Sequence, residues 1–447
     1  MTLDWGHCYS KLTPRREGDT KVFKKHTWSR RLQYRQRQIA GRGRWLAVIL
    51  IVFASLMAGG KVNNAGTAIA GFRAGYGVYA IDVSTAQQVA AAPVLPRKTE
   101  ILTILRKVNS YQLENPVLEK SGSGKPITDP LQLPWPRVTW YTGVMAAWEA
   151  TRDPEYLEQS LAYGRQLQWQ EGKEQIAPNR LWPIQLWAEL YFAKKDPAII
   201  RPSVQWLDTP DPLTPASSKQ WYLVAHSGHS ATPIPFADSL YGMSALAMLA
   251  KATGDRKYIE IMNAFFDETT SALLDKESGL YYRDPTYIGQ KTPNGKKMLW
   301  SRGNGWVFAG IPRVLDYLPK HDASRQRYLE IFLRMVPEVV KRQGTDGLWR
   351  VNLDDQDQFP NPETSGSGFF CFGLAWGINH KVLSRRECLP AVVKAWAGLN
   401  RSLSPQGKVL WCQPIGAEPK AVALDSTHEF GTGTFMLAGS EVYKLAR

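Results

Sequence analysis

One stretch near the middle of the chain has to be buried on almost every side. Residues 240–250 are nearly all apolar or small, and Asp238 is the only acidic residue within 236–254. A helix that is apolar all round is stable only when it is buried on most sides. The rest of the chain must therefore cover this helix.

From residue 97 onward the chain is predicted to be mainly helical. Apolar side chains recur there with the 3.6-residue period of a helix, and alternating strand patterns are scarce. We expect the short segments 279–283, 347–350 and 408–411 to pair only locally. The predicted helices lie at 101–108, 138–150, 154–170, 182–193, 238–253, 257–274, 305–318, 325–340, 366–380, 389–403 and 431–445, so the predicted class is all-α.

Turns of similar sequence recur between these helices. ATRDPEY at 150–156, AKKDP at 193–197 and ATGDRKY at 252–258 each join one helix to the next. A second kind of turn begins at Gly279, Gly347 and Gly407, 68 and 60 residues apart.

About six helical hairpins of that length fit into residues 92–447. Hairpins of this kind cannot bury their apolar faces alone. Closed into a ring they form an (α/α)6 barrel of six helical hairpins, and left open they form a solenoid. Open arrays usually have a more regular period and polar terminal repeats, and the long aromatic loops of this chain favour the closed ring.

The N-terminal segment carries most of the positive charge. Residues 1–44 hold 12 basic and 3 acidic side chains, so +9 of the net charge of +15 lies there, which is poor evidence for nucleic-acid binding. The apolar run 45–58 is short for a membrane-spanning helix of ~20 residues and suits a signal peptide. We expect 1–70 to be a basic leader, 71–96 a linker and 97–447 an exported barrel domain; an uncleaved anchor at 45–58 remains an alternative.

The cysteines and histidines indicate no metal site. The four cysteines have no CxxC spacing, and a disulfide between Cys388 and Cys412 is an option that sequence alone does not establish. His226 and His229 lack the glutamate of a zinc-protease helix. We therefore predict no metal and no cofactor.

Two segments carry the candidate chemistry. Asp238 stands where a helix N-cap would, which is the more frequent role of such a carboxylate, or it is a proton donor at the mouth of a buried helix. WSRGNGW at 300–306 offers a planar guanidinium suited to a carboxylate in Arg302 and an adaptable amide in Asn304. It has no GxGxxG spacing, so nucleotide binding is not expected.

The same segment carries a family resemblance. WSRGNGW, followed by VFAGIPRVL at 307–315, resembles the signature of the unsaturated uronyl hydrolases of glycoside hydrolase families 88 and 105. The resemblance covers roughly 97–447 and by itself implies an (α/α)6 barrel. Further segments match in order: DSLYGM at 238–243, GLYYRD at 279–284, DGLWR at 346–350, PETSGSGFF at 362–370 and GTGTFMLAGSEVY at 431–443.

The resemblance also implies a reaction. These enzymes hydrate the C4=C5 double bond that a polysaccharide lyase leaves on a terminal uronic acid. Asp238 would protonate C4 and then help water to add at C5, while Arg302 would bind the uronate carboxylate. The partner would be an acidic unsaturated oligosaccharide, with no nucleic acid or protein partner implied. The other residues predicted to contact the substrate are Trp300, Trp306, Asn304, Asn179 and Trp140.

One position departs from the family pattern. Members usually carry a second active-site acid before the helix that precedes the AKKDP turn, and counting back places Asn179 there. An amide can hold water or a hydroxyl but cannot act as a base. A non-catalytic or weakly active glycan-binding relative is therefore an alternative, and an ordinary inverting glycosidase on the same barrel is a third.

Overall fold

The computed structural model describes residues 94–447, apart from 118, 120–124, 174–176, 210–233 and 417. The leader, its apolar run at 45–58 and the histidines 226 and 229 lie outside these residues. In the part of the chain that the structure describes, no helix is long and apolar enough to cross a membrane.

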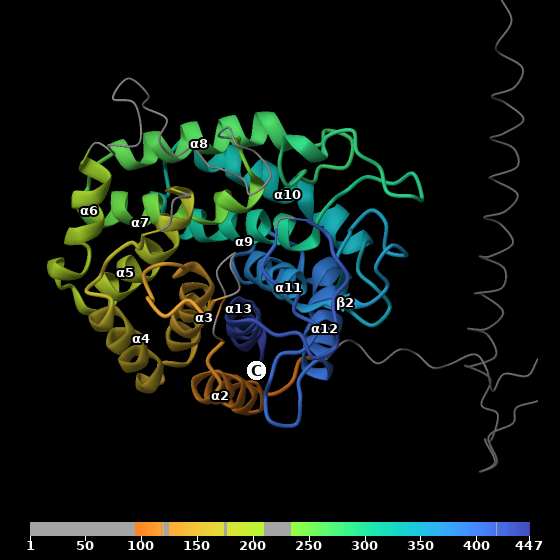
Figure 1. Ribbon diagram of the computed structural model, residues 1–447, viewed down its shortest axis with the longest axis horizontal. Coiled ribbons are helices and arrows are strands. Elements are labelled where there is room, and N and C mark those ends of the chain that lie inside the picture. The colour runs from red at the N-terminus through yellow and green to blue at the C-terminus, as the bar shows by residue number, and fades with distance from the viewer. Residues whose placement is uncertain (1–93, 118, 120–124, 174–176, 210–233, 417) are drawn as a thin grey trace, which may run out of the picture. The chain divides into compact units, whose positions relative to one another are not determined.

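The helices of the described chain form two concentric rings (Figure 1). The inner ring closes, because each inner helix contacts the next and α13 contacts α3. The inner helices are α3 (Trp135–Thr151), α5 (Leu181–Lys194), α7 (Ser244–Thr253), α9 (Ser301–Tyr317), α11 (Thr364–Asn379) and α13 (Glu429–Leu445).

Each inner helix alternates along the chain with an outer one. The outer helices are α2 (Lys98–Glu114), α4 (Pro154–Gln166), α6 (Arg201–Asp208), α8 (Lys257–Leu273), α10 (Arg325–Lys341) and α12 (Arg385–Arg401). The predicted all-α (α/α)6 barrel is confirmed, and the open solenoid is excluded because the first and last inner helices touch.

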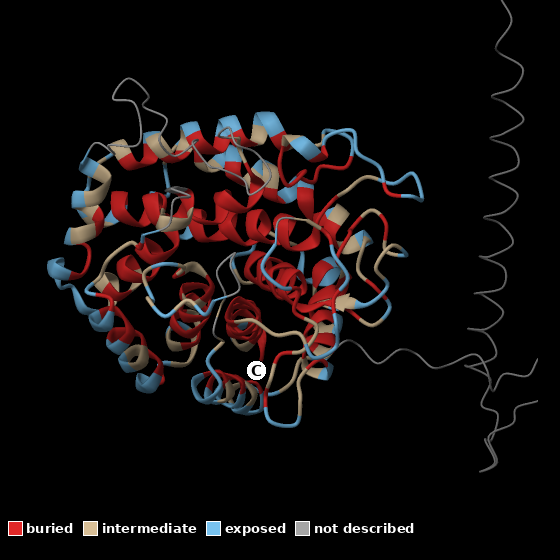
Figure 2. Ribbon diagram, viewed as in Figure 1, coloured by how far each residue is buried: buried red, intermediate tan, exposed pale blue. Residues whose placement is uncertain are grey.

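Burial follows this arrangement (Figure 2). Residues 240–250, which the sequence predicted to be surrounded, are all buried, and α11 is buried from Thr364 to Ile378. Outer helices bury one face only, as α10 does with Tyr328, Phe332, Met335, Val336 and Val339.

The recurring turns have recurring geometry. After α3, α5 and α7 the side chains of Asp153, Asp196 and Asp255 accept hydrogen bonds from backbone N–H groups two residues later. After the outer helices α8, α10 and α12, Gly279, Gly347 and Gly407 adopt φ values of 68°, 90° and 107°. Glycine adopts these left-handed conformations without a Cβ penalty, which explains its place in the repeat.

The short extended segments pair locally, as predicted. β1 (Trp349–Arg350) pairs with β2 (Pro362–Glu363), and single bridges join Leu274 to Tyr281 and Leu403 to Val409.

Three expectations from the sequence need correction. Asp238 is not a helix cap: it lies inside a 3-10 turn, η5 (Ala237–Tyr241), whose N-cap position is Phe236 and has no side-chain cap bond. Cys388 and Cys412 are free thiols, so the optional disulfide does not form. The predicted set of helices lacks the short helix α6 and begins α9 four residues late, because Gly303 and Gly305 lower the helix propensity of the segment that forms its first turns.

Two glycines let the inner ring close tightly between its first and last helices. A Cβ on Gly143 would overlap the carbonyl oxygen of Gly433, and a Cβ on Gly433 would overlap that of Thr139. Backbone therefore packs against backbone where α3 meets α13, and neither atom can move without shifting a helix.

Gly433→Ala is predicted to destabilise the barrel by about 1–3 kcal/mol or more, because overpacking a rigid backbone contact strains both helices. Denaturant unfolding would measure this. Gly416→Ala is the control, since its Cβ would meet only the Pro414 carbonyl oxygen at 3.8 Å. Equal stabilities of the two variants would contradict the close packing of α3 on α13.

Candidate active site

The inner helices bring their N-terminal ends together. Each is preceded in the chain by an outer helix that runs back along the barrel, so all six inner helices run in one direction. Contacts at this end bear this out: Trp135 at the start of α3 has its ring 6.1 Å from that of Trp306 in α9 and stacks on Phe430 of α13. Polar side chains at these six N-terminal ends are therefore neighbours, although they are spread over about 300 residues.

Asp238 lies at this end, just before α7. The residue is 9% exposed, and its Oδ2 is 3.5 Å from Nε of Arg283. Its Oδ1 has no hydrogen-bond partner among the described residues and would lie 3.3 Å from a Cβ on Gly303 in the first turn of α9.

Burial sets the protonation behaviour of this carboxyl. Desolvation raises the pKa of Asp238 above its ordinary value, and the nearby charge of Asp284 acts in the same direction. The guanidinium groups of Arg283 and Arg302 oppose this shift. The acid form of Asp238 therefore persists to higher pH than that of an exposed aspartate.

Arg302 is placed close to Asp238 but is held by the protein. Its two terminal nitrogens donate to the carbonyl oxygens of Gln413 (2.6 Å) and Pro414 (2.8 Å). Its guanidinium carbon lies 4.6 Å from the ring of Trp300 and 4.8 Å from that of Phe430. With 1% of its surface exposed, Arg302 fastens the loop after α12 to α9. Its predicted role as the carboxylate clamp stays a prediction.

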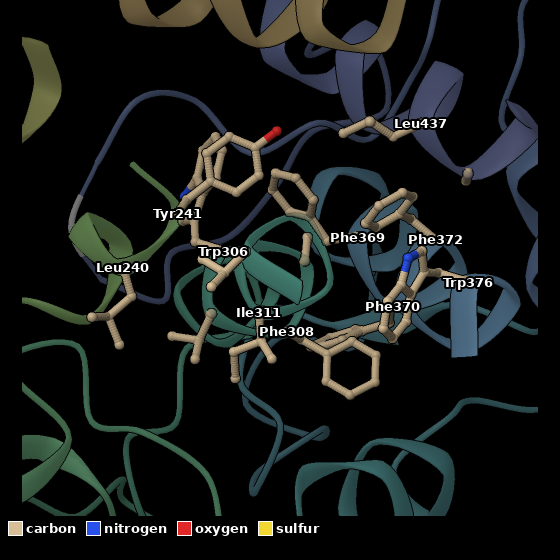
Figure 3. Close-up of a cluster of buried hydrophobic side chains, with 14 of the residues drawn as sticks. Leu240, Tyr241, Trp306, Phe308, Ile311, Phe369, Phe370, Phe372, Trp376 and Leu437 are labelled. Atoms are coloured by element: carbon tan, nitrogen blue, oxygen red, sulfur yellow. The ribbon is translucent and has the colours of Figure 1, made fainter. Parts of the chain in front are cut away.

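The other residues of WSRGNGW are also deeply buried. The indole N–H of Trp300 donates to Gln413 (2.7 Å). Asn304 exchanges hydrogen bonds with the backbone of Tyr281 and donates to the carbonyl of Trp300. Trp306 is 2% exposed and packs against Tyr241 and Phe369 (Figure 3). It also contacts the rings of Trp182 and Trp135.

The two other residues predicted to contact the substrate, Trp140 in α3 and Asn179 just before α5, lie outside the WSRGNGW segment. The indole N–H of Trp140 donates to Asn109 of the outer helix α2 (3.0 Å), while Trp135 is the aromatic residue of α3 that contacts Trp306. Asn179 is half-buried in a 3-10 turn, η2 (Ala177–Arg180), directly before α5. The preceding residue, Pro178, packs its carbonyl against Gly242, four residues after Asp238.

Arg283 is the residue of this site that the sequence did not single out. It lies in the GLYYRD segment, and its backbone carbonyl accepts a hydrogen bond from the N–H of Ala237 (2.8 Å). Its terminal nitrogen donates to Asp284 (2.9 Å) and its guanidinium lies over Phe236 at 4.7 Å. The matching segment was a signal for it, but its distance from Asp238 in sequence concealed the pairing.

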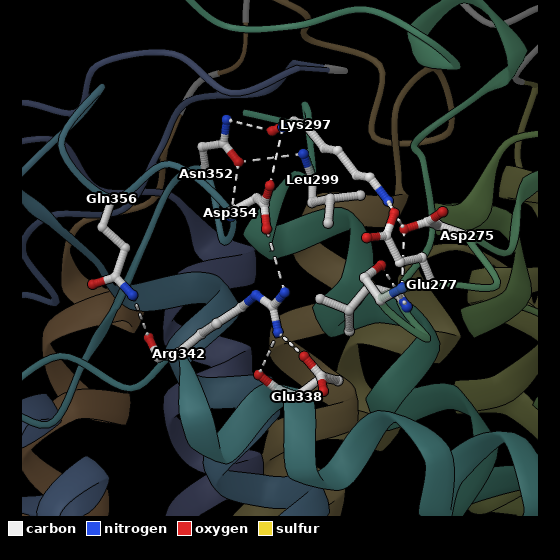
Figure 4. Close-up of polar contacts among 11 residues, drawn as sticks. Asp275, Glu277, Lys297, Leu299, Glu338, Arg342, Asn352, Asp354 and Gln356 are labelled. Atoms are coloured by element: carbon white, nitrogen blue, oxygen red, sulfur yellow. Dashed lines mark hydrogen bonds and ion pairs between the residues drawn. The ribbon is translucent and has the colours of Figure 1, made fainter. Parts of the chain in front are cut away.

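A network of ion pairs holds the loop that leads into α9 (Figure 4). Lys297 pairs with Asp275 (2.6 Å) and Glu277 (2.7 Å). Asp354 accepts from the backbone N–H of Lys297 (3.0 Å) and pairs with Arg342 (3.3 Å). The start of α9, and with it Arg302, is therefore fixed both by the beginning of its own connecting loop and by the loop after α10.

Glu363 caps the neighbouring inner helix α11. It accepts hydrogen bonds from the backbone N–H groups of Ser365 and Gly366, and from that of Gln413. In the described ranges no group of three or more His, Cys, Asp or Glu side chains is placed to hold a metal ion.

Comparisons with known proteins agree on the family that this chain resembles. The model of Glycosyl Hydrolase Family 88 matches residues 106–446. An unsaturated 3S-rhamnoglycuronyl hydrolase from Formosa agariphila is 34% identical over 325 residues, covering 70% of this chain and 84% of the relative.

Two solved structures share the fold at appreciable identity. A glycosyl hydrolase family 88 protein from Bacteroides vulgatus is 28% identical with a TM-score of 0.66, covering 78% of this chain and 99% of that structure. A polysaccharide lyase is 31% identical with a TM-score of 0.64, covering 78% of this chain and 98% of that structure.

Arg302→Gln is predicted to loosen the loop that Arg302 anchors, because two charge-assisted hydrogen bonds to its carbonyls are lost. Hydrogen exchange at Trp411, Cys412 and Gln413 should accelerate by about tenfold or more, as about 1.5–3 kcal/mol is expected per hydrogen bond to a charged group. Arg327→Gln, which breaks an exposed pair with Asp267, is the control and should leave this loop protected. Unchanged exchange in Arg302→Gln would contradict the anchoring role.

Proposed function

Because the chain belongs to glycosyl hydrolase family 88 and is a glycoside hydrolase acting on carbohydrate, we propose that it removes a Δ4,5-unsaturated uronic acid from the non-reducing end of lyase-made oligosaccharides. The substrate is then an acidic unsaturated oligosaccharide. The observation that carries the proposal is Asp238: a buried carboxyl with an unpartnered oxygen, set beside two guanidinium groups.

The proposed reaction uses this carboxyl twice. Protonated Asp238 gives its proton to C4 of the double bond, and the ring oxygen stabilises the positive charge that develops at C5. Water adds at C5 and returns a proton to the Asp238 carboxylate. The resulting hemiketal opens by breaking the bond between C5 and the ring oxygen, and the hemiacetal left at C1 releases the aglycone. One water is consumed, and Asp238 is regenerated.

The raised pKa of Asp238 suits both steps. The first step needs the acid form near neutral pH, and burial favours that form. The second step needs the carboxylate, which the positive charge of Arg302 favours once the proton has left. A single residue can therefore serve as acid and base.

The alternative function, that of a relative which binds glycans without turning them over, rests on Asn179 at the position where family members usually carry an acid. In the proposed mechanism Asn179 orients water or a sugar hydroxyl and takes no proton. Because Asp238 serves as both acid and base there, the mechanism does not need a second carboxylate.

The polysaccharide lyase among the similar structures supports a second candidate reaction. A lyase creates the C4=C5 bond by β-elimination, whereas the proposed hydrolase consumes it. The conjugated double bond absorbs in the ultraviolet, so one assay separates the two: absorbance falls for the hydrolase and rises for the lyase.

We propose in addition that residues 1–70 export the barrel or anchor it through 45–58, with 71–96 as a linker to the 97–447 domain. The support is the basic lead-in followed by a 14-residue apolar run.

Asp238→Asn is predicted to lower turnover of an unsaturated glucuronosyl-rhamnose disaccharide by about 10²–10⁴-fold, because the amide cannot donate the proton. The loss of ultraviolet absorbance measures turnover. Asp267→Asn, on the outer helix α8, is the matched control and should keep wild-type activity. Full activity of Asp238→Asn would refute the mechanism, and rising absorbance on a saturated glycan would favour the lyase.

Asn179→Asp is predicted to move the alkaline limb of the pH–kcat profile to higher pH, by on the order of one unit. A second carboxylate disfavours ionisation of Asp238, so its acid form survives to higher pH. Asn179→Ser adds no charge and should leave the limb in place. An unmoved limb in Asn179→Asp would mean that Asn179 does not lie near Asp238.

A further inference from the structure

Two charged groups at the site face each other without completing their hydrogen bonds. Nε of Arg283 and Oδ1 of Asp238 are both buried, and neither has a hydrogen-bond partner among the described residues. The two side chains approach only to 3.5 Å, between Nε and Oδ2. Buried polar groups are nearly always satisfied, and exceptions concentrate at sites that receive a ligand or water.

Arg283 is nevertheless held firmly in place. Asp284, which is fully buried, accepts a hydrogen bond from one terminal nitrogen and also accepts from the backbone N–H of Thr286. The ring of Phe236 supports the guanidinium from one side. The orientation of Arg283 is therefore fixed by the protein, while the Nε edge next to Asp238 lacks a hydrogen bond.

Arg302 differs from Arg283 in that the protein already occupies its terminal nitrogens. Both of its terminal nitrogens already donate to backbone carbonyls, and aromatic rings lie against its guanidinium. A substrate carboxylate at these nitrogens would compete with the loop that Arg302 anchors. Of the two guanidinium groups near Asp238, Arg283 is the one prepared to accept a new anion.

We propose that Arg283 is the specificity-determining residue that binds the uronate carboxylate of the substrate, and that Asp238 is its partner only in the free enzyme. The proposal rests on the function proposed above. A planar guanidinium matches a carboxylate in a forked geometry, which a long contact to one oxygen of Asp238 does not use.

The proposal accounts for the position of the proton donor. The uronate carboxylate is attached to C5, and C4 is the neighbouring ring carbon. A carboxylate held at Arg283 therefore places both carbons of the double bond next to Asp238. No second carboxylate is needed to align the substrate.

Binding also prepares the acid. The charged groups that act on Asp238 are Arg283 and Asp284 from the loop after α8 and Arg302 from α9. When the substrate carboxylate neutralises Arg283, one of the two charges that lower the pKa of Asp238 is compensated. Asp238 then holds its proton more firmly in the complex than in the free enzyme, which is the state that the first step requires.

The test compares an unsaturated glucuronosyl-rhamnose disaccharide with its methyl ester, which lacks the negative charge. Calorimetry on the full chain carrying Asp238→Asn measures binding without turnover. The acid should bind at least about tenfold more tightly than the ester, as expected for a charge-assisted pair. Adding Arg283→Gln should reduce this ratio to about one, and Arg283→Lys should restore part of it. Adding Arg302→Gln or the exposed control Arg327→Gln should leave it unchanged.

The ratio of the affinities for the acid and the ester separates carboxylate recognition from a merely structural role of Arg283, since a loosened site would weaken the binding of both ligands alike. A ratio that survives Arg283→Gln but collapses in Arg302→Gln would overturn the proposal and assign the carboxylate to Arg302. Binding of neither ligand would overturn it too. An Arg283-dependent ratio without turnover by the wild-type chain would sustain the proposal and reject the proposed hydrolysis. Turnover by the wild-type chain, together with an acid-to-ester affinity ratio that does not depend on Arg283, would sustain the proposed hydrolysis and reject the role of Arg283.

Discussion

The burial of one carboxylate governs the arrangement of this end of the barrel. A charged aspartate removed from water is unstable unless cations or hydrogen bonds replace its hydration. Asp238 has no cap bond, and its ion pair with Arg283, between Oδ2 and Nε, is 3.5 Å long; the charge of Arg302 also acts on it. The raised pKa follows from this incomplete compensation, and so does the capacity of the residue to release and accept a proton at one position.

The surrounding aromatic and polar groups keep that environment rigid. Trp306 packs against rings from α3, α5, η5 and α11, so four inner segments fix the first turns of α9. Asn304 ties the same turns to the loop carrying Arg283. Lys297 joins the two ends of that loop through Asp275 and fastens it to Asp354 in the loop after α10. Arg302 completes the set by anchoring the loop after α12. Much of the WSRGNGW segment therefore serves to hold the loops that shape the site, which explains why its side chains are buried.

Much of this could be predicted from the sequence, because local chemistry dictated it. The apolar stretch 240–250 required burial on most sides, and the recurring Asp and Gly turns indicated helical hairpins. Helix boundaries were harder to predict. Gly303 and Gly305 argue against a helix by propensity, but the close approach of Asp238 to Gly303 and of Phe369 to Gly305 makes small residues necessary in the first turns of α9. The same reasoning explains why Asp238 was mistaken for a cap, since its 3-10 turn is stabilised by tertiary burial and not by its own side chain.

The sequence by itself therefore determined an all-α ring of hairpins and singled out Asp238 as the candidate proton donor, because period, turn residues and motif order are properties of neighbouring residues. Only the tertiary structure decided which cation faces that carboxyl. Arg283 and Asp238 are 45 residues apart, and nothing local distinguishes Arg283 from Arg302. The difference arises because the loop after α12 reaches back to occupy the nitrogens of one guanidinium and leaves an edge of the other without a partner.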